Sequence, residues 1–93
     1  MIKSFKCPET EHVFQRQRSR KFSPQIQRRA QMRLDRIEAA MEVSDLRLPP
    51  SHNLEKLIGN RKGQYSIRIN GQWRICFKWR NGNAHDVEIV DYH

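Results

Sequence analysis

Residues 65–93 alternate between apolar and polar side chains, and this pattern limits the possible folds more than any other feature of the chain. Apolar residues occupy every second position in three runs, which Asn-Gly turns separate. The alternation predicts a three-stranded antiparallel sheet with one apolar face, because a shift of one residue would move every apolar side chain to the other face. The apolar positions are Tyr65, Ile67, Ile69, Trp73, Ile75, Phe77, Trp79, Val87 and Ile89.

The two turns decide which residues face each other across this sheet. A two-residue turn at 70–71 would place an isoleucine opposite an arginine, whereas three-residue loops at 70–72 and 81–83 keep apolar residues opposite one another. We therefore predict three-residue loops. The resulting pairs are Ile69 with Trp73, Ile67 with Ile75, Ile75 with Ile89, and Phe77 with Val87.

The polar face of the sheet contains two arginines, Arg68 and Arg74, which this register places directly opposite each other. Like charges that face each other across a strand pair cost about 0.2–1 kcal/mol. Two arginines at one point indicate a bound anion, and guanidinium groups suit phosphate because they donate two hydrogen bonds in parallel. The alternative is an ordinary solvated face, on which Asp86 and Glu88 neutralise the arginines.

Composition limits the class of protein. The 93 residues form one domain, residues 1–93, and with 37% hydrophobic residues the apolar sheet face needs a helix to cover it. No segment is typical of a signal peptide or approaches the ~20 apolar residues of a membrane span, so we expect a cytoplasmic protein. Neither the two cysteines nor the four histidines have metal-ligand spacing, so we expect reduced thiols, no bound metal and no cofactor.

The net charge of +8 is concentrated in the first part of the chain, because residues 1–36 contain ten Lys/Arg and three acids. Such an excess favours a polyanionic partner. We favour nucleic acid over an anionic membrane surface, because the main predicted helix has no large aromatic face.

Two helices are predicted before the sheet. Pro8 opens a short one, and Ser23-Pro24 starts a second that runs to about Glu42. The apolar stripe of the second helix covers the sheet and consists of Ile26, Ala30, Leu34, Ile37 and Met41. Residues 2–6 are predicted to form a short strand, and residues 53–58 either a short strand or a packed loop.

Basic residues cluster in the segment between the helices and on one side of the second helix. The alternative to a binding role is a solubilising surface, paired partly with Asp35 and Glu38. As a group they fit a docking surface for nucleic acid better, because arginines at helical spacing repel one another unless they are screened. The predicted docking residues are Arg16, Arg18, Arg20, Lys21, Arg28, Arg29, Arg33 and Arg36.

Four segments resemble the HigB and GraT-like branch of the RelE-type toxins of bacteria. They are Gly59-Asn60-Arg61, Gln64-Tyr65-Ser66-Ile67-Arg68-Ile69-Asn70, Trp73-Arg74-Ile75 and Val87-Glu88-Ile89-Val90-Asp91-Tyr92-His93. The resemblance covers nearly the whole chain in length and element order. It implies an α+β fold of the RelE-like type, in which two N-terminal helices pack on one face of a twisted antiparallel sheet.

The resemblance also implies a function: a ribosome-dependent endoribonuclease of a type II toxin-antitoxin system, which cuts mRNA in the ribosomal A site and inhibits translation. A helix-turn-helix, HigA-like antitoxin is the implied protein partner, and ribosomal RNA is the expected partner of the predicted docking residues. The implied reaction is metal-free attack of the ribose 2′-OH on the adjacent phosphate, which needs a proton acceptor, cations at the phosphate and a proton donor. The alternative function is a non-catalytic RNA- or ribosome-binding module.

The family places functional weight on particular positions. The matching catalytic candidates are Arg74, Asp91, Tyr92 and His93. The RNA phosphate-binding candidates follow from the sheet register and from the basic residues beside the sheet, and they are Arg68, Arg74, Lys56, Arg61 and Lys62. Some relatives carry a histidine and a lysine in the segment that matches residues 53–59, where this chain has Glu55 and Ile58. His52 and Lys56 lie nearby and are candidates to compensate.

Overall fold

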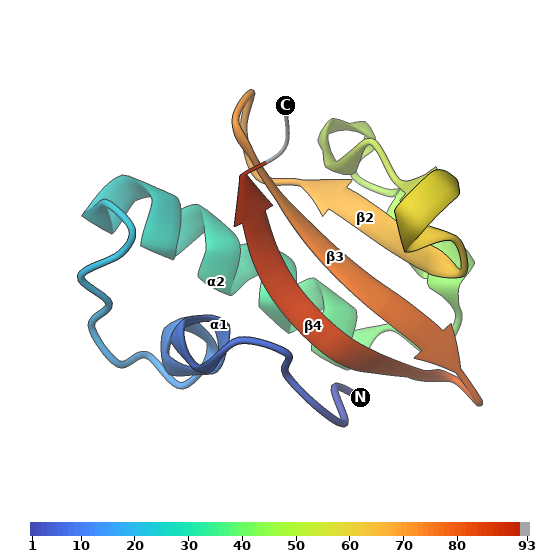
Figure 1. Cartoon of the computed structure of the whole chain (residues 1–93), viewed down its shortest axis with the longest axis horizontal. Helices are drawn as coiled ribbons and strands as arrows, with labels where there is room; N and C mark the ends of the chain where they lie inside the picture. Colours follow the sequence, from blue (N-terminus) through green and yellow to red (C-terminus); the bar gives the residue numbers. More distant parts are fainter. Residues whose placement is uncertain (92–93) are drawn as a thin grey trace.

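The computed structural model describes residues 1–91 as two helices and a four-stranded antiparallel sheet (Figure 1). The helices are α1 (Pro8–Phe14) and α2 (Pro24–Ala39), and the strands, in sheet order, are β1 (Glu55–Lys56), β2 (Gln64–Arg68), β3 (Trp73–Arg80) and β4 (Asn83–Asp91). Short 3-10 helices η1, η2 and η3 cover Val43–Arg47, Pro50–His52 and Gly59–Arg61. The predicted α+β class with two N-terminal helices is confirmed.

Helix α2 begins where the sequence predicts and ends earlier. Ser23 Oγ accepts a hydrogen bond from the Ile26 N–H at 3.3 Å, which caps the first turn. The helix stops at Ala39 because the N–H groups of Met41 and Glu42 donate to the Asp45 carboxylate, at 2.9 and 3.0 Å, instead of continuing the helical ladder. The predicted end near Glu42 is therefore wrong. So is the place of Met41 in the apolar stripe, since Met41 is 81% exposed.

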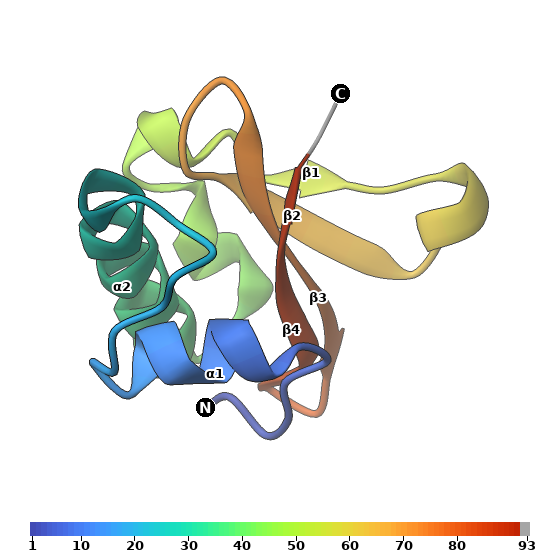
Figure 2. The ribbon, with the colours of Figure 1, turned by 60° about the vertical axis from the view of Figure 1, so that its left-hand side comes forward.

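The core lies between α2 and one face of the sheet. Both helices occupy one side of the strands, whereas the segment around η3 extends on the other side (Figure 2). Ala30, Leu34 and Ile37 of α2 are fully buried in one cluster with the apolar residues of the strands. The sheet contributes Ile67, Ile75, Phe77, Ala84, Val87 and Ile89 to that cluster, and Ile69 joins it from the loop that follows β2.

The first hairpin has the predicted register. Ile67 pairs with Ile75, and Arg68 pairs with Arg74. The Ile69 N–H donates to the Trp73 carbonyl at 2.9 Å, which closes the three-residue loop. The two arginines are thus opposite each other in the backbone, as the sequence predicts.

The second hairpin turns differently from the prediction. Its loop has two residues, Asn81 and Gly82, with φ of 52° and 76°, and Arg80 pairs with Asn83. These positive φ values are typical of a type I′ turn. The predicted three-residue loop is therefore wrong.

A β-bulge compensates for the shorter turn. Between the pairs Cys76–Glu88 and Lys78–His85, two residues of β4 oppose one residue of β3, and Asp86 has a φ of 53°. The extra residue restores the parity of β4, so that Ile75 pairs with Ile89 as predicted. Phe77 and Val87 are both fully buried at the point where the register shifts.

Two shorter segments complete the sheet. The predicted strand at residues 2–6 is reduced to two parallel bridges with β4, Ile2 to Ala84 and Phe5 to Val87. The segment 53–58 forms the two-residue strand β1, which pairs with β2. Within residues 1–91, no helix has the length and apolar character needed to cross a membrane.

Candidate nucleic-acid interface

Arg74 is a basic residue that the fold holds firmly in the polar face of the sheet. It is 8% exposed. Its Nε donates to Ser66 Oγ at 2.8 Å, and its Nη2 donates to the Asn53 carbonyl at 2.6 Å. Because Ser66 lies on β2 and Asn53 precedes β1, three segments together fix the direction in which the guanidinium points.

Glu55 is the carboxylate next to Arg74. Its Oε2 lies 3.9 Å from Arg74 Nη2, and its side chain is 52% exposed. Strand β1 positions it, because Glu55 pairs with Ser66 and therefore shares a sheet face with Arg74. The sequence analysis treated Glu55 only as a departure from the family. Placing Glu55 beside Arg74 would have required knowing that residue 55 pairs with residue 66, and the sequence carries no signal for that pairing.

The acids predicted to neutralise Arg68 and Arg74 bind other groups. Glu88 accepts a hydrogen bond from Arg61 Nη1 at 2.8 Å and lies 3.8 Å from Lys6 Nζ. Asp86 lies 3.4 Å from Lys78 Nζ. These pairs do not fit the alternative of an ordinary solvated face around the two arginines.

Cys76 and His52 are buried and structural. Burial, ahead of the charges around it, raises the pKa of the Cys76 thiol. His52 is fully buried, and its Nδ1 lies 3.1 Å from the Leu46 carbonyl oxygen. His52 therefore cannot reach a substrate, and the suggestion that it compensates for a missing family histidine is wrong.

The predicted phosphate-binding residues separate into different places. Arg61 contacts Glu88, on the same side of the sheet as Arg74. Lys62 is exposed in the turn after η3. Lys56 pairs with Tyr65, one position along from the Glu55–Ser66 pair, and so lies on the opposite sheet face from Arg74.

The C-terminal candidates are described only as far as Asp91. Asp91 pairs with Trp73, and its Oδ2 accepts a hydrogen bond from Gln72 Nε2 at 3.1 Å. This contact brings the end of β4 to the loop of the first hairpin. Tyr92 and His93 lie outside the described residues.

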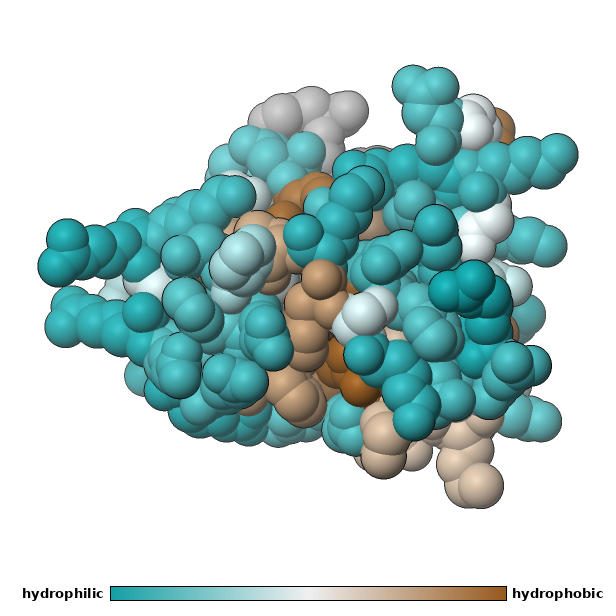
Figure 3. Space-filling view, turned by 60° about the horizontal axis from the view of Figure 1, so that its bottom comes forward, coloured by the Kyte–Doolittle hydropathy of each residue, from teal (hydrophilic) through white to brown (hydrophobic). Residues whose placement is uncertain are grey.

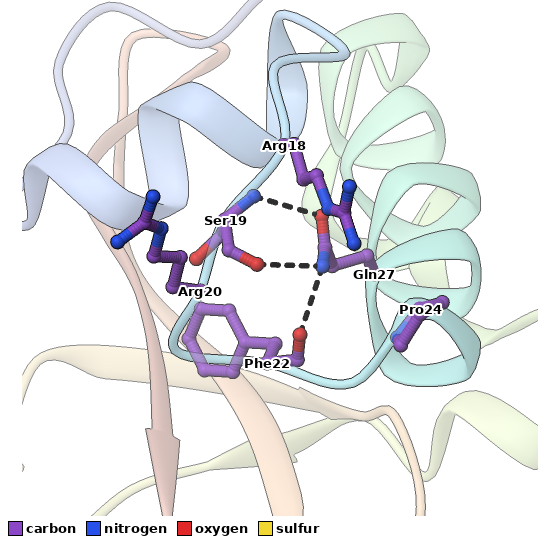
Figure 4. Close-up of a pocket in the computed structure, with 6 residues that line it drawn as sticks. All are labelled: Arg18, Ser19, Arg20, Phe22, Pro24 and Gln27. Atoms are coloured by element: carbon purple, nitrogen blue, oxygen red, sulfur yellow. Dashed lines mark hydrogen bonds between the residues drawn. The ribbon is translucent and has the colours of Figure 1, made fainter.

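The basic segment between α1 and α2 is held by a buried glutamine. Gln27 Oε1 accepts from the Ser19 N–H at 3.1 Å, and Gln27 Nε2 donates to the Ser19 and Phe22 carbonyls at 2.9 and 2.8 Å (Figure 4). The Phe22 ring packs edge-on against Trp73, with ring centroids 5.2 Å apart. A hollow of about 650 Å³ lies among Arg18, Ser19, Arg20, Phe22, Pro24 and Gln27.

Most of the predicted docking residues form no ion pair with an acid of the described chain. Arg16 is an exception, because it forms a two-bond contact with Asp35, at 2.6 and 3.1 Å, which raises the pKa of the Arg16 guanidinium. Glu38 accepts a hydrogen bond from the Ile2 N–H. Both acids expected to screen the helix arginines are thus used elsewhere. Within residues 1–91, no ion pair involves Arg18, Arg20, Lys21, Arg28, Arg29, Arg33 or Arg36.

The surface agrees with a polyanionic partner. The face in Figure 3 is largely hydrophilic, with a narrow apolar band between its hydrophilic regions. The net charge of +8, together with docking arginines other than Arg16 that form no ion pair within residues 1–91, makes the protein surface basic. Such a surface attracts nucleic acid through its phosphates.

A protein-family model gives this fold and surface a family. The model describes the RelE-like toxin HigB of type II toxin-antitoxin systems and matches residues 3–93. The chain belongs to the HigB family of RelE-like toxins. The family resemblance seen in the sequence is thereby confirmed.

Two HigB relatives illustrate the match. Endoribonuclease HigB from Proteus vulgaris is 34% identical over 93 residues, which is 100% of both chains. Toxin HigB-1 from Vibrio cholerae serotype O1 is 48% identical over 52 residues, 56% of this chain and 55% of that toxin.

Solved structures support the HigB fold. In the heterotetrameric YoeB-YefM toxin-antitoxin complex from Staphylococcus aureus, one chain is similar with a TM-score of 0.63 and 20% identity, over 100% of this chain and 98% of that one. The YoeB dimer from the same organism gives a TM-score of 0.60 and 22% identity, over 99% and 97%. At this identity the likeness concerns the fold alone.

Proposed function

We propose that this HigB-family protein is a ribosome-dependent endoribonuclease, which cleaves mRNA in the ribosomal A site and thereby inhibits translation and growth. Family membership and the full-length relative named endoribonuclease HigB support the proposal. The observation that carries it at the level of chemistry is the pair of Arg74 and Glu55, a fixed guanidinium beside an accessible carboxylate.

This pair suits the first half of the reaction. Glu55 accepts the proton of the ribose 2′-OH, and the 2′ oxygen then attacks the adjacent phosphorus. Arg74 stabilises the negative charge that builds up on the phosphate oxygens. Its burial and its bonds to Ser66 and Asn53 hold it in place before the substrate arrives.

The second half of the reaction requires a proton donor. The P–O5′ bond breaks, the 5′ oxygen takes up a proton, and a 2′,3′-cyclic phosphate remains on the other fragment. We assign this donation to the C-terminal residues, with His93 or Tyr92 as the donor and Asp91 orienting it. Lys56, Arg61 and Lys62 remain proposed RNA contacts outside the Arg74–Glu55 pair.

We also propose a protein partner, a helix-turn-helix, HigA-like antitoxin encoded beside the toxin. Membership in a type II toxin-antitoxin family supports an antitoxin of some kind. An adjacent reading frame that encodes a short helix-turn-helix protein would support this partner. Co-purification of the two proteins would test the complex directly.

Cleavage in a translating extract tests the enzymatic proposal. New mRNA 5′ ends within A-site codons are expected with the wild type. Glu55→Gln should lower the cleavage rate by about 100-fold, because losing a general base typically costs a factor of 10²–10⁴. Glu11→Gln is the matched control, since it makes the same change at an exposed position of α1 that has no proposed RNA contact. If wild-type protein bound ribosomes and produced no new ends, the non-catalytic binding module would be the correct function.

A further inference from the structure

A pocket rich in arginine lies where α2 meets the loop of the first hairpin, away from the Arg74–Glu55 pair. Its volume is about 360 Å³. Two of its arginines come from α2 and one from the end of β2. The residues that line it are Arg29, Arg33, Ser51, Arg68, Ile69, Asn70 and Gly71.

The pocket brings positive charges together, and no acid of the described part of the chain pairs with them. Arg33 Nε donates to the Arg68 carbonyl at 3.0 Å, which anchors the helix arginine at the end of β2. Burial, and then the neighbouring Arg29 and Arg36, lower the pKa of Arg33. The surroundings of the Arg33 guanidinium therefore destabilise its positive charge. In the described chain, residues 1–91, none of the three pocket arginines forms an ion pair.

The other polar groups of the pocket add hydrogen-bond donors. Ser51 is exposed and carries a hydroxyl. Asn70 Oδ1 already accepts from the N–H groups of Gln72 and Trp73, at 2.9 and 2.8 Å, so the amide NH₂ is the remaining donor group of Asn70. A pocket of guanidinium, hydroxyl and amide donors fits an anion with several acceptor oxygens.

The side chains of Arg68 and Arg74 extend in different directions, although the two residues are paired across the strands. The Arg74 guanidinium donates to Ser66 and Asn53, toward β1. Arg68 Nη2 lies instead by the loop, where a Cβ on Gly71 would be 3.7 Å away. The two guanidinium groups therefore diverge from adjacent positions, which suits two successive groups of one extended ligand.

We propose that the pocket of Arg29, Arg33 and Arg68 binds a backbone phosphate of the substrate RNA, close along the strand to the phosphate held by Arg74. The identity of the ligand as substrate RNA rests on the proposed function. Arg68 thereby belongs to a strand-holding site shared with α2 and not to the bond-breaking site. A second phosphate contact fixes the register of the RNA strand across Arg74.

Binding of an uncleavable, fluorescein-labelled 2′-O-methyl RNA hexamer tests the proposal by anisotropy at several salt concentrations. Arg29→Gln and Arg68→Gln should each raise the dissociation constant about 10-fold and reduce the salt slope by about one. Arg80→Gln is the matched control, because it removes the same charge from an exposed position in the other hairpin, and a change of about 2-fold or less is expected. An equal rise of the dissociation constant in all three variants would indicate a diffuse basic surface and would overturn the proposed phosphate site.

Gly71→Asp tests the same site without removing an arginine. The φ of Gly71 lies outside the left-handed region, and the nearest atom to a Cβ there is Arg68 Nη2, so the new carboxylate can occupy the pocket without backbone strain. RNA affinity should fall as in Arg68→Gln, while the urea unfolding midpoint stays at the wild-type value. Wild-type RNA affinity in this variant would contradict the proposal.

A titration with inorganic phosphate separates this inference from the proposed function. The backbone amide signals of Ser51, Asn70 and Gly71 should shift and saturate in heteronuclear NMR spectra. Saturable shifts in a protein that cleaves no mRNA would contradict the proposed function alone. Cleavage without such shifts would overturn the pocket alone. Pocket variants that keep RNA affinity and lose only antitoxin or only ribosome binding would also overturn it, because the occupant would then be a protein carboxylate or ribosomal RNA.

Discussion

Arg74 combines a structural role with its proposed role at the phosphate. Replacing it by alanine should lower the free energy of unfolding by about 1–3 kcal/mol, because the buried Ser66 hydroxyl and the Asn53 carbonyl both lose a donor. Urea denaturation at neutral pH measures this loss. Arg68→Ala is the control, since Arg68 is exposed and its side chain has no comparable bonds in residues 1–91. Equal stability of Arg74→Ala and wild type would show that these bonds contribute nothing.

His52 should make the stability of the fold depend on pH. Burial, with smaller effects from Arg33 and Arg36, lowers the pKa of His52 in the folded chain. As the pH falls below about 6.5, the unfolded chain binds a proton that the folded chain resists, so the free energy of unfolding decreases, by at most about 1.4 kcal/mol per pH unit. The stabilisation is complete above that pH.

Urea denaturation of wild type and His52→Asn between pH 5 and pH 7.5 tests this dependence. Asparagine retains an N–H donor for the Leu46 carbonyl and does not titrate in this range. The wild type should lose more stability than the variant on acidification. Parallel pH profiles would rule out His52 as the source.

The sequence predicted the opposition of Arg68 and Arg74 but not the directions of their side chains. Strand register follows from the alternation of apolar residues, and that pattern is local. The direction of a guanidinium depends on acceptors such as the Asn53 carbonyl, which a distant segment brings to Arg74. Glu55 was overlooked for the same reason, because a two-residue strand leaves no readable alternation.

Among the elements, the segment between α1 and α2 depends on one side chain. Gln27→Ala removes three hydrogen bonds to the backbone of Ser19 and Phe22 and should release this segment. Trypsin, which cuts after Arg and Lys, should then cleave at Arg18, Arg20 and Lys21 at least 10-fold faster, as expected for a stability loss of about 1.4 kcal/mol or more. Gln31→Ala is the matched control on the same helix. Unchanged trypsin resistance of Gln27→Ala would contradict this role.

The second hairpin shows why an element can be predicted with the right faces and the wrong turn. A regular hairpin with a two-residue turn would not pair Ile75 with Ile89. One extra unpaired residue is needed, and either a third loop residue or a bulge in β4 can supply it. Each solution keeps these two residues paired, so the apolar pattern cannot distinguish them. The Asn81-Gly82 sequence alone favours the two-residue turn, and the positive φ of Asp86 shows where the extra residue went.

At the scale of the whole molecule, docking and cleavage are expected to separate. A triple variant with Arg18, Arg20 and Lys21 changed to glutamine should raise KM on translating ribosomes about 10-fold or more, with little change in kcat. The reason is that this segment packs through Phe22 against Trp73, on the opposite sheet face from Arg74. The KM effect should shrink as salt rises. A fall in kcat with unchanged KM would place this loop in the reaction itself.

The first residues of the chain protect the outer side of β4. Met1, Lys3, Ser4 and Lys6 exchange backbone hydrogen bonds with Ala84 and Val87, so these two residues of the edge strand do not present their N–H and C=O groups to other chains. Strand β1 at the opposite edge is only two residues long and exposed, which offers little template for pairing. A chain shortened by residues 1–6 should therefore self-associate edge to edge, which size-exclusion chromatography would reveal as species larger than the full chain. An affinity tag fused at this end is better joined through a linker that leaves residues 1–6 in place.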